Sequence, residues 1–372
     1  MLTIIVKGTN GCNLACSYCS LGEKSNFKFI TEDDLKSIMI YSCDLARFRS
    51  EKKINFILHG GEPTLVKSEI YDECISFIKD KYSDLEVKIS MQTNGFSMTD
   101  QFMNLIKKHD IHVGISIDGS KEIHDSERKT INGTDTFDRV TNTIEKLLDA
   151  NVPVSCLMVL TQNALKKDLK YLHYFEEKKI HLKINPLLNY GETVDHPELV
   201  LDKNDYSNYI IKVYETMVHE NIDVYVSPID KILTGIIHNQ QIKECSFDSQ
   251  CNHHFLCIDY KRDIYPCGKF SDIDKMCIGN VDDTTFDQIE DYLLKKICIR
   301  RNKNIPQKCK ECRYVRLCNA GCSAEAMIEG EYYNTPILCE DYYMLFNYFY
   351  TDGLKLLKET LIKNKRFLEE QI

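Results

Sequence analysis

The stretch that decides the fold is LTIIVKGTNGCNLACSYC, residues 2–19. Leu2 to Lys7 is a short apolar run typical of a buried strand, and turn residues follow it at once. Cys12, Cys16 and Cys19 then lie in the loop, at spacings of four and three. Three thiolates at this spacing can hold a four-iron cluster and leave one iron open to a small molecule. A structural zinc site is the alternative, but zinc prefers a fourth protein ligand, and none stands at the usual spacing.

Outward from this loop, short apolar runs alternate with amphipathic stretches over the first 220 residues. Strands alternating with helices of this length predict βαβ units and a parallel sheet. Six units are too few for a closed eight-stranded barrel, so we expect an α/β fold with a partial (β/α)6 TIM barrel and a site at the strand C-terminal ends. The expected strands are Leu2–Lys7, Lys53–Leu58, Glu86–Thr93, His112–Ile117, Val152–Leu160 and His181–Leu187.

The pattern changes after about residue 230, where apolar periodicity weakens. Eleven of the 17 cysteines lie between Cys245 and Cys339. A segment with many cysteines and little regular structure is ordered more readily by metal–ligand bonds than by a large apolar core. We therefore expect three parts: a barrel over residues 1–230, a cysteine-rich domain over 231–345, and a C-terminal helix over 346–372.

Composition limits the kinds of partner and the cellular compartment that we expect. The 372-residue chain has a formal net charge of −9, which argues against a nucleic-acid partner. No apolar run is long enough for a membrane span and none has the form of a signal peptide, so we expect no membrane partner and a cytoplasmic protein, where thiols stay reduced. A local exception is the basic segment Lys295–Arg316, which is either a solvated face or a docking surface.

Three further motifs follow strand ends: HGGEP at 59–63, QTNG at 92–95 and SIDG at 116–119. With the cysteine triplet, they resemble the radical S-adenosylmethionine (radical SAM) family. The resemblance implies that Cys12, Cys16 and Cys19 hold a 4Fe–4S cluster and that SAM is bound beside it. The implied SAM contacts are Tyr18 near the adenine, Gly61 and Glu62 at the methionyl amino group, Ser116 at the ribose, Arg128 facing the carboxylate and Leu187 near the adenine.

The cysteine-rich part carries CKECRYVRLCNAGC at 309–322 and resembles the SPASM domain, which holds two auxiliary 4Fe–4S clusters. By this resemblance the first auxiliary cluster is held by Cys245, Cys251, Cys267 and Cys322, and the second by Cys309, Cys312, Cys318 and Cys339. Eight thiolates is also the number that fully ligates two four-iron clusters. Two zinc sites remain open, because CxxC pairs suit zinc as well.

Of the six remaining cysteines, Cys43, Cys74 and Cys156 fit small buried hydrophobes, and Cys298 has basic neighbours. Cys257 and Cys277 are candidate hydrogen-atom donors. Together with Asp272, they are the weak candidates for catalytic residues, whose identity the sequence does not give.

Length and layout resemble the anaerobic sulfatase-maturating enzymes, which oxidise a cysteine or serine of a client protein to formylglycine. Those enzymes carry an aspartate base directly after the third cysteine of the first auxiliary site, where this chain has Gly268. On this ground we expect instead a maturase that forms a carbon–carbon or thioether crosslink in a ribosomally made precursor peptide, with sulfatase maturation as the alternative. A flavodoxin- or ferredoxin-type donor is the implied electron source. A nucleic-acid-modifying enzyme and a non-enzymatic iron–sulfur or zinc protein fit the motifs less well.

Overall fold

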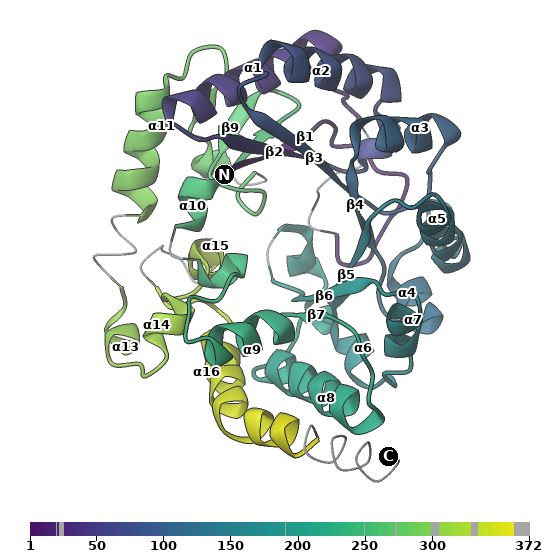
Figure 1. The fold of residues 1–372 in the computed structure, drawn as a ribbon, viewed down its shortest axis with the longest axis vertical. Coiled ribbons are helices and arrows are strands. Elements are labelled where there is room, and N and C mark those ends of the chain that lie inside the picture. The colour runs from purple at the N-terminus through teal and green to yellow at the C-terminus, as the bar shows by residue number, and fades with distance from the viewer. Residues whose placement is uncertain are drawn as a thin grey trace, which may run out of the picture.

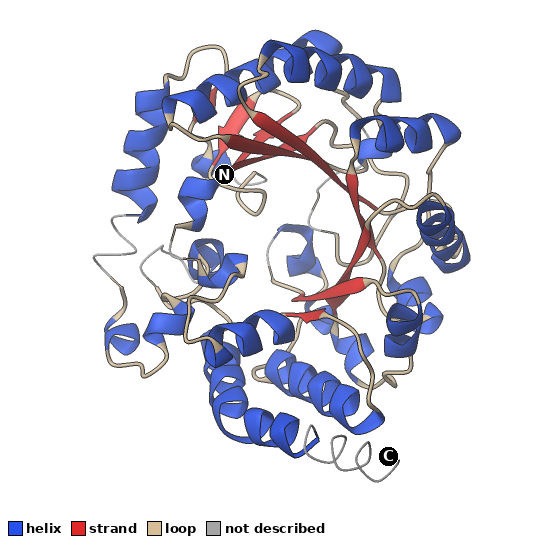
Figure 2. Ribbon diagram, in the orientation of Figure 1, coloured by secondary structure: helices blue, strands red, loops and turns tan. Residues whose placement is uncertain are grey.

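The protein is seen in a computed structural model that describes residues 1–19, 21, 26–189, 191–248, 250–271, 274–298, 305–328 and 334–360. Ten strands form one sheet in the order β10-β9-β8-β1-β2-β3-β4-β5-β6-β7. Their bounds are β1 Leu2–Lys7, β2 Lys53–His59, β3 Glu86–Thr93, β4 His112–Ser116, β5 Val154–Leu160, β6 His181–Pro186, β7 Val226–Ser227, β8 Phe255–Asp259, β9 Asp263–Tyr265 and β10 Gly279–Asn280. The α/β partial barrel is confirmed. Figures 1 and 2 show its strands following an open arc with helices outside it.

The helices of the barrel follow the strands. They are α1 Glu32–Phe48, α2 Ser68–Lys81, α3 Asp100–His109, α4 Lys121–Glu127, α5 Phe137–Asp149, α6 Gln162–Leu165, α7 Tyr171–Glu177, α8 Asp205–Glu220 and α9 Ile229–Ile237. The helices of the cysteine-rich part are shorter. They are α10 Cys251–His254, α11 Phe286–Tyr292, α13 Gln307–Lys310, α14 Val315–Cys318, α15 Ser323–Ile328 and α16 Cys339–Tyr348. None of the described helices is both long and apolar enough to cross a membrane.

Strand pairing separates the two faces of the barrel. Val6 of β1 is in register with Leu58 of β2 and Ile258 of β8, and all three are at most 1% exposed. They belong to the apolar core beneath the helices. Because side chains alternate along a strand, the neighbouring positions point to the barrel interior. That inner face mixes polar and apolar side chains: Ser90 Oγ donates to Asn55 Oδ1 at 3.1 Å, and Ile5 is half-buried there.

Local signals in the sequence explain where helices begin. Thr31 caps α1 by accepting a hydrogen bond from the Asp34 backbone N–H at 3.1 Å, as its position before three acids predicts. In α2 the buried face is centred on Tyr71, Cys74 and Ile78, whereas Ile70 and Phe77 are only half-buried at its edges.

The cysteine-rich part is continuous with the barrel sheet. β8 pairs with β1 in parallel, so β8 extends the barrel sheet instead of forming a separate small sheet. At the other end of the sheet, α16 lies against α8, where the Ser207 backbone N–H donates to Asp341 Oδ1 at 2.8 Å. Of the predicted C-terminal helix, residues 361–372 lie outside the described part of the chain.

Candidate active site

The cysteine loop between β1 and α1 is held at the C-terminal end of the sheet. The Ala15 backbone N–H donates to the carbonyl of Lys129 at 2.8 Å, and the Ser17 N–H to that of Glu127 at 3.0 Å. Cys12 is 8% exposed, and burial raises the pKa of the Cys16 thiol to about 12, with the Cys19 and Cys12 sulfurs close enough to add to that effect. The structure thus brings the three predicted thiols together.

Hydrogen-bond donors point at one of these sulfurs. Asn94, from the QTNG motif after β3, donates through Nδ2 to Cys12 Sγ at 3.6 Å and to Asn13 Oδ1 at 2.8 Å. The Leu14 backbone N–H also reaches Cys12 Sγ at 3.4 Å. Donors around a sulfur stabilise its anionic form and tune the reduction potential of a bound cluster. Asn94 was not singled out from the sequence, although its motif was.

The donor set fits the cluster that the motif implies. The buried Cys16 thiol, whose pKa is raised, stays protonated in the absence of metal, and iron binding would exchange its proton for an Fe–S bond. Among the described residues, no three His, Cys, Asp or Glu side chains converge tightly enough for a single metal ion. That test applies to one ion, whereas the thiolates of a four-iron cluster bind separate irons.

A buried ion pair lies beside the cysteine loop. Arg128 Nε donates to Asp118 Oδ2 at 2.7 Å, and the two side chains are 7% and 0% exposed. The Tyr18 hydroxyl also donates to Asp118 Oδ2, and the guanidinium lies over the Tyr18 ring at 5.2 Å. Burial opposes the charge on Arg128, but Asp118, Tyr18 and Cys16 together outweigh burial and raise the pKa of Arg128 above its ordinary value. Asp118, which sequence reasoning did not assign, is therefore the centre that fixes Tyr18 and Arg128.

The two predicted adenine neighbours meet. Tyr18 and Leu187 form a small apolar cluster with Leu199, separate from the main core, and Cys16 packs against it. Ser116, predicted at the ribose, is half-buried on the inner face and accepts a hydrogen bond from Gln92 Nε2 at 3.0 Å. These residues lie at the C-terminal end of the barrel strands. Their contacts with SAM stay predictions.

The GGEP segment is tied to the cysteine loop by its backbone. Gly61 N–H donates to the carbonyl of Thr9 at 2.8 Å, and a Cβ on Gly61 would lie 2.0 Å from the Gly11 carbonyl oxygen, so only glycine fits. The Glu62 carboxylate is 1% exposed and accepts bonds from Thr93 Oγ1 at 2.6 Å and the Asn94 N–H at 2.8 Å. Glu62 therefore braces two strand-end loops, and its predicted contact with the SAM amino group stays untested.

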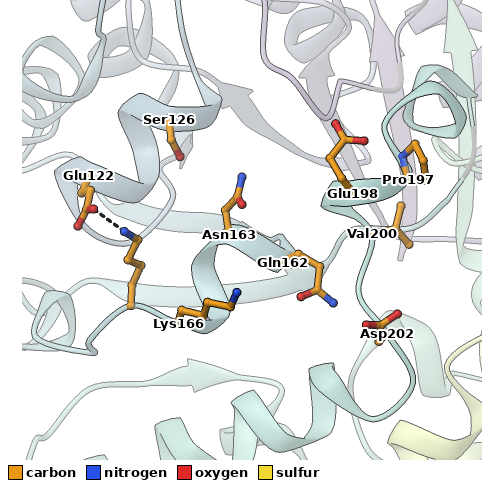
Figure 3. Close-up of a pocket in the computed structure, with 10 residues that line it drawn as sticks. Glu122, Ser126, Gln162, Asn163, Lys166, Pro197, Glu198, Val200 and Asp202 are labelled. Atoms are coloured by element: carbon orange, nitrogen blue, oxygen red, sulfur yellow. Dashed lines mark hydrogen bonds and ion pairs between the residues drawn. The ribbon is translucent and has the colours of Figure 1, made fainter.

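A polar hollow of about 560 Å³ opens on one side of the loop, between α4, α6 and residues 197–202 (Figure 3). Asn163, which lines it, donates through Nδ2 to Glu127 Oε1 at 2.7 Å, and Glu127 in turn accepts from the Ser17 hydroxyl. Its lining mixes Glu122, Glu198 and Asp202 with lysines, and Figure 3 shows Glu122 paired with one of them.

In the cysteine-rich part, four of the predicted ligands converge. Burial raises the pKa of the Cys251 thiol well above its usual value, and the neighbouring sulfurs of Cys245, Cys322 and Cys267 raise it further. Lys269 Nζ lies 3.9 Å from Cys322 Sγ. Four thiols in one place match the set that the resemblance assigned to the first auxiliary cluster.

The other four cysteines lie in or beside three short helices, with Cys309 in α13 and Cys312 two residues after its end. The Cys312 backbone N–H donates to the Cys309 carbonyl at 3.2 Å, Cys318 ends α14, and Cys339 begins α16. Burial raises the pKa of the Cys339 thiol, and the nearby Cys312 sulfur adds to it. Their assignment to a second auxiliary cluster stays a prediction.

The weak catalytic candidates gain little from the structure. Asp272 lies outside the described residues. Cys257 is fully buried on β8, and Cys277 Sγ donates to the Gly279 carbonyl at 3.4 Å. Cys43, Cys74 and Cys156 are at most 2% exposed, as expected for core residues. Within the basic segment, residues 299–304 lie outside the described part of the chain.

Gly268 lies against the barrel interior. A Cβ placed on it would be 3.2 Å from Ile5 Cδ1, an inner-face side chain of β1. The neighbouring Lys269 forms an ion pair with Glu325, N to O at 3.1 Å. The position at which the resemblance implies a base therefore lies beside Ile5 of β1 and carries no side chain.

Comparison with known proteins places these features in a family. Residues 6–172 match the family model described as the radical SAM superfamily. A cysteine-type anaerobic sulfatase-maturating enzyme of Clostridium novyi is 29% identical, over 86% of this chain and 87% of its own. A second such enzyme, from Clostridium perfringens, is 28% identical, over 93% and 96%. The solved structure of native anSMEcpe with bound AdoMet and Cp18Cys peptide matches with a TM-score of 0.80 at 24% identity, over 96% and 98% of the two chains.

These relatives correct one prediction. The expected crosslinking peptide maturase is wrong as the leading interpretation, because the relatives that match along most of the chain are sulfatase-maturating enzymes. The glycine at the single position 268 does not outweigh a likeness that spans the barrel and the cysteine-rich part. The radical SAM assignment itself is confirmed. With its cysteine loop, its strand-end motifs and the family match over residues 6–172, this chain carries a radical SAM domain, which supports SAM and a 4Fe–4S cluster as its cofactors.

Proposed function

We propose that the chain is a cysteine-type anaerobic sulfatase-maturating enzyme, which oxidises a cysteine of a sulfatase polypeptide to formylglycine. The observation that carries the proposal is the likeness to two such Clostridium enzymes over 86% and 93% of this chain. The structural neighbour with a bound peptide supports a peptide or protein substrate. Reduced cysteines and the oxygen sensitivity of an open iron site favour an anaerobic cytoplasm as its setting.

The site would divide the work between the barrel and the cysteine-rich part. When bound, SAM and the cluster at Cys12, Cys16 and Cys19 would supply the radical chemistry that removes a hydrogen atom from the substrate Cβ. The substrate then loses one electron and its thiol proton to become a thioaldehyde, which water converts to the aldehyde and hydrogen sulfide. Arg128, held by Asp118, and Tyr18 orient SAM, and the apolar cluster of Tyr18 and Leu187 keeps water from its adenosyl end.

The convergence of Cys251 with three other thiols supports an auxiliary cluster that accepts the substrate electron. With a second auxiliary cluster at Cys309, Cys312, Cys318 and Cys339, the enzyme would carry three 4Fe–4S clusters, or about twelve irons per chain. Anaerobic iron and sulfide analysis after reconstitution checks that number. Bound zinc with little iron would contradict it.

The thiol proton needs an acceptor other than a side chain at 268. The inner face of the barrel carries polar, half-exposed side chains, so we propose that water in the interior takes this proton. An aspartate at 268 should then speed the reaction, since a positioned base contributes about 10²–10⁴-fold. Because a Cβ at 268 meets Ile5 Cδ1 at 3.2 Å, the variant to test is Gly268→Asp together with Ile5→Val, which removes that methyl group. Ile5→Val alone is the matched control.

The proposal is tested by turnover of a short cysteine-containing sulfatase peptide with the reconstituted enzyme, SAM and dithionite. We expect mass spectrometry to show conversion of the peptide cysteine to formylglycine, with one 5′-deoxyadenosine released per conversion. The same peptide with alanine at that position should give no product. Steady SAM cleavage with an unchanged cysteine would refute the proposal.

A further inference from the structure

Two lysines, one from the barrel and one from the cysteine-rich part, lie beside the four-thiol site, which is formed by Cys245, Cys251, Cys267 and Cys322. The first is Lys269, whose Nζ is 3.9 Å from Cys322 Sγ. The backbone of the same residue takes part, because the Lys269 N–H bonds to the Cys267 sulfur. One residue therefore presents two hydrogen-bond donors to two different sulfurs of the four-thiol site.

A buried carboxylate holds the Lys269 side chain in this position. Glu325 is 1% exposed, and its Oε1 accepts a hydrogen bond from Lys269 Nζ at 3.1 Å. The buried Tyr342 hydroxyl donates to the other oxygen, Glu325 Oε2, at 2.8 Å. Because both carboxylate oxygens are bonded, the carboxylate is fixed, and it keeps the ammonium group of Lys269 next to Cys322.

The second lysine comes from the barrel. Lys183 lies on the inner face of β6, because its neighbours Leu182 and Ile184 are buried in the core on the other face. Its Nζ pairs with Glu244 Oε1 at 2.6 Å, and the Cys245 backbone N–H donates to the same oxygen at 3.2 Å. This ion pair therefore joins the barrel to the first cysteine of the four-thiol site.

The two cations oppose the effect of burial on a sulfur of this site. Burial raises the pKa of the Cys245 thiol to about 11, and the Cys322 sulfur adds to the rise. Lys269 and Lys183 act in the opposite direction, and each lowers that pKa by more than the Glu244 carboxylate raises it. The two lysines therefore favour negative charge on the sulfur.

A cluster in the four-thiol site would be stabilised by these charges. Its negative charge grows by one unit when it takes up an electron, and nearby charges and hydrogen bonds to its sulfurs set its reduction potential. In a buried site of low dielectric constant, a cation this close favours the more negative, reduced form. One acid acts the other way, since Asp248 raises the pKa of the Cys251 thiol, but its carboxylate lies 3.1 Å from the His254 ring.

We propose that Lys269 and Lys183 raise the reduction potential of the cluster in the four-thiol site and thereby enable it to take the electron of the substrate radical. In that step the substrate radical loses one electron to the cluster and its thiol proton to water, and it becomes the thioaldehyde. Both lysines are positioning residues, because they act through the sulfurs and not on the substrate. The inference rests on the auxiliary cluster of the proposed function, and it does not depend on the identity of the substrate.

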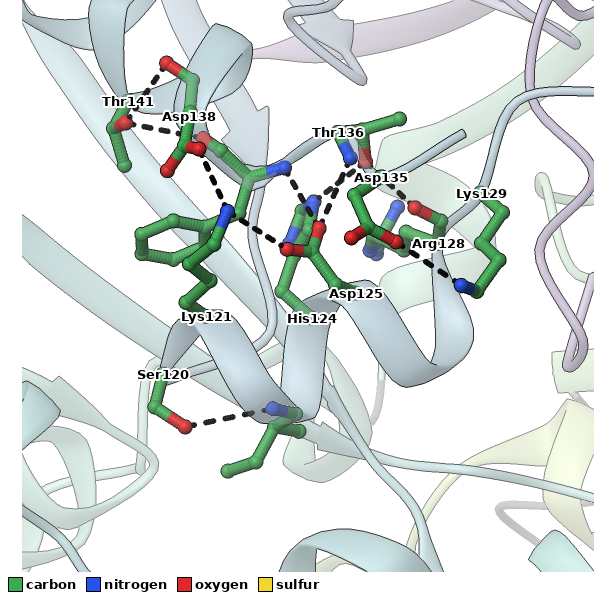
Figure 4. A network of polar contacts seen from close by, with 12 residues as sticks. Ser120, Lys121, His124, Asp125, Arg128, Lys129, Asp135, Thr136, Asp138 and Thr141 are labelled. Atoms are coloured by element: carbon green, nitrogen blue, oxygen red, sulfur yellow. Dashed lines mark hydrogen bonds and ion pairs between the residues drawn. The ribbon is translucent and has the colours of Figure 1, made fainter. Parts of the chain in front are cut away.

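The test is a redox titration of the reconstituted full-length enzyme, followed by electron paramagnetic resonance. The signal of the SAM cluster is recognised by its change when SAM is added, which leaves the signals of the auxiliary clusters for comparison. The variants are Lys269→Met, Lys183→Met and Glu325→Gln, and Lys269→Arg keeps the positive charge. The matched control is Lys121→Met on α4, where the lysine pairs with the buried Asp125, also at 3.1 Å (Figure 4). Figure 1 shows α4 across the barrel from α10 and α15, between which the four-thiol site lies in the chain.

We expect Lys269→Met and Lys183→Met each to shift the redox equilibrium of one auxiliary cluster about tenfold toward the oxidised form, which lowers its reduction potential by about 59 mV. Glu325→Gln should raise the potential of the same cluster, because the charge of Lys269 is then no longer offset. Disturbed packing alone does not give shifts of opposite sign. Lys269→Arg and Lys121→Met should leave the potential at the wild-type value.

An unchanged potential in Lys269→Met or in Lys183→Met would overturn the proposal. So would shifts of the same sign in Lys269→Met and Glu325→Gln, or an equal shift in the SAM cluster. Lys183 lies on a barrel strand, so its variant tests the proposal even if Lys269→Met does not take up the cluster. Iron analysis separates the two proposals: about four irons per chain would reject the auxiliary clusters and this inference together, whereas about twelve irons with unchanged potentials would reject the inference alone.

Discussion

The two cysteine regions of this chain are held by different means. The N-terminal cysteine loop is held by contacts that need no metal. These are the Asp118–Arg128 ion pair, the hydrogen bonds of Glu62 and the backbone hydrogen bonds to residues 127 and 129. The thiols of Cys245, Cys251, Cys267 and Cys322 come from short, separate elements, which the partly exposed Lys269–Glu325 ion pair also helps to join. A reactive open site requires a framework that persists when its occupants change, whereas a closed cluster can serve as its own framework.

The largest effect should separate the two regions by function. Cys16→Ala removes a ligand of the open site, so we expect SAM cleavage to fall to the level seen without enzyme. Cys251→Ala should keep SAM cleavage within an order of magnitude but lose formylglycine formation, because the substrate electron has no acceptor. Release of 5′-deoxyadenosine and peptide mass measure the two steps.

Cys43→Ala serves as the control for both variants, since this thiol is fully buried in the helix core. If folded Cys251→Ala lost SAM cleavage as well, the proposal that the two cysteine regions serve separate steps would be wrong.

The next largest effect is on the stability that the buried Asp118–Arg128 ion pair gives to the metal-free protein. Arg128→Met leaves the Asp118 carboxylate buried without its partner, and breaking such a pair costs about 3–5 kcal/mol. We expect thermal unfolding of the metal-free protein to shift down by many degrees. Arg47→Met, at an exposed ion pair with Asp84, should shift it little. Equal shifts in the two variants would show that the buried pair is not what supports the loop.

A pH effect of intermediate size follows from His124. Burial lowers the pKa of this imidazole to about 4, with Asp118 opposing the shift and Arg128 adding to it. Because the unfolded value is near 6.5, the folded protein gains nothing from this group above that pH and loses stability as the pH falls toward 4. Between pH 7.5 and 5 the free energy of unfolding should drop by about 2 kcal/mol on this account.

Urea unfolding of the metal-free wild type and of His124→Gln at these two pH values checks the sign. The variant is less stable at pH 7.5, because the imidazole bonds to the Asp118 N–H and to Thr136 Oγ1 are lost. It should nevertheless show a smaller drop on acidification. If the free energy of unfolding fell equally in both proteins, His124 would not be the cause of the pH dependence.

The smallest effect concerns the sulfur of Cys12. Asn94→Ala removes the amide that donates to it at 3.6 Å, which should lower the reduction potential of the SAM cluster by tens of millivolts, because a hydrogen bond to sulfur favours the more negative, reduced form. Electron paramagnetic resonance in a redox titration measures this. Thr99→Ala, at the cap of α3, is a control on a nearby loop that should leave the potential unchanged.

Sequence reasoning went furthest where a local pattern decides the structure. The six barrel strands and the Thr31 cap follow from apolar runs and capping chemistry, which act over a few residues. The partners of Arg128 could not be predicted from the sequence, because Asp118 and Tyr18 meet only after the sheet has formed. The bonds from Thr93 and Asn94 to the Glu62 carboxylate could not be predicted either, because they join two strand ends that are about 30 residues apart in the sequence.

The place of the cysteine-rich part was also beyond local patterns. Phe255–Asp259 reads as a short strand, but no periodicity states that its partner is β1. Gly268 carried too much weight for a related reason. The glycine at 268 shows only that this position cannot accept the thiol proton of the substrate. The function depends on all the residues that surround the substrate.

The pairing of β8 with β1 has a consequence for how the chain is made. The first strand of the protein has an uncovered edge until residues 255–259 have left the ribosome, about 200 residues after β2 is complete. At typical synthesis rates this takes roughly 10–40 s. During that time the nascent barrel presents an open strand to other chains, a known route to aggregation. We therefore expect the yield of folded protein to depend on translation speed and chaperone supply in the segment between β7 and β8 more than in any other part of the chain.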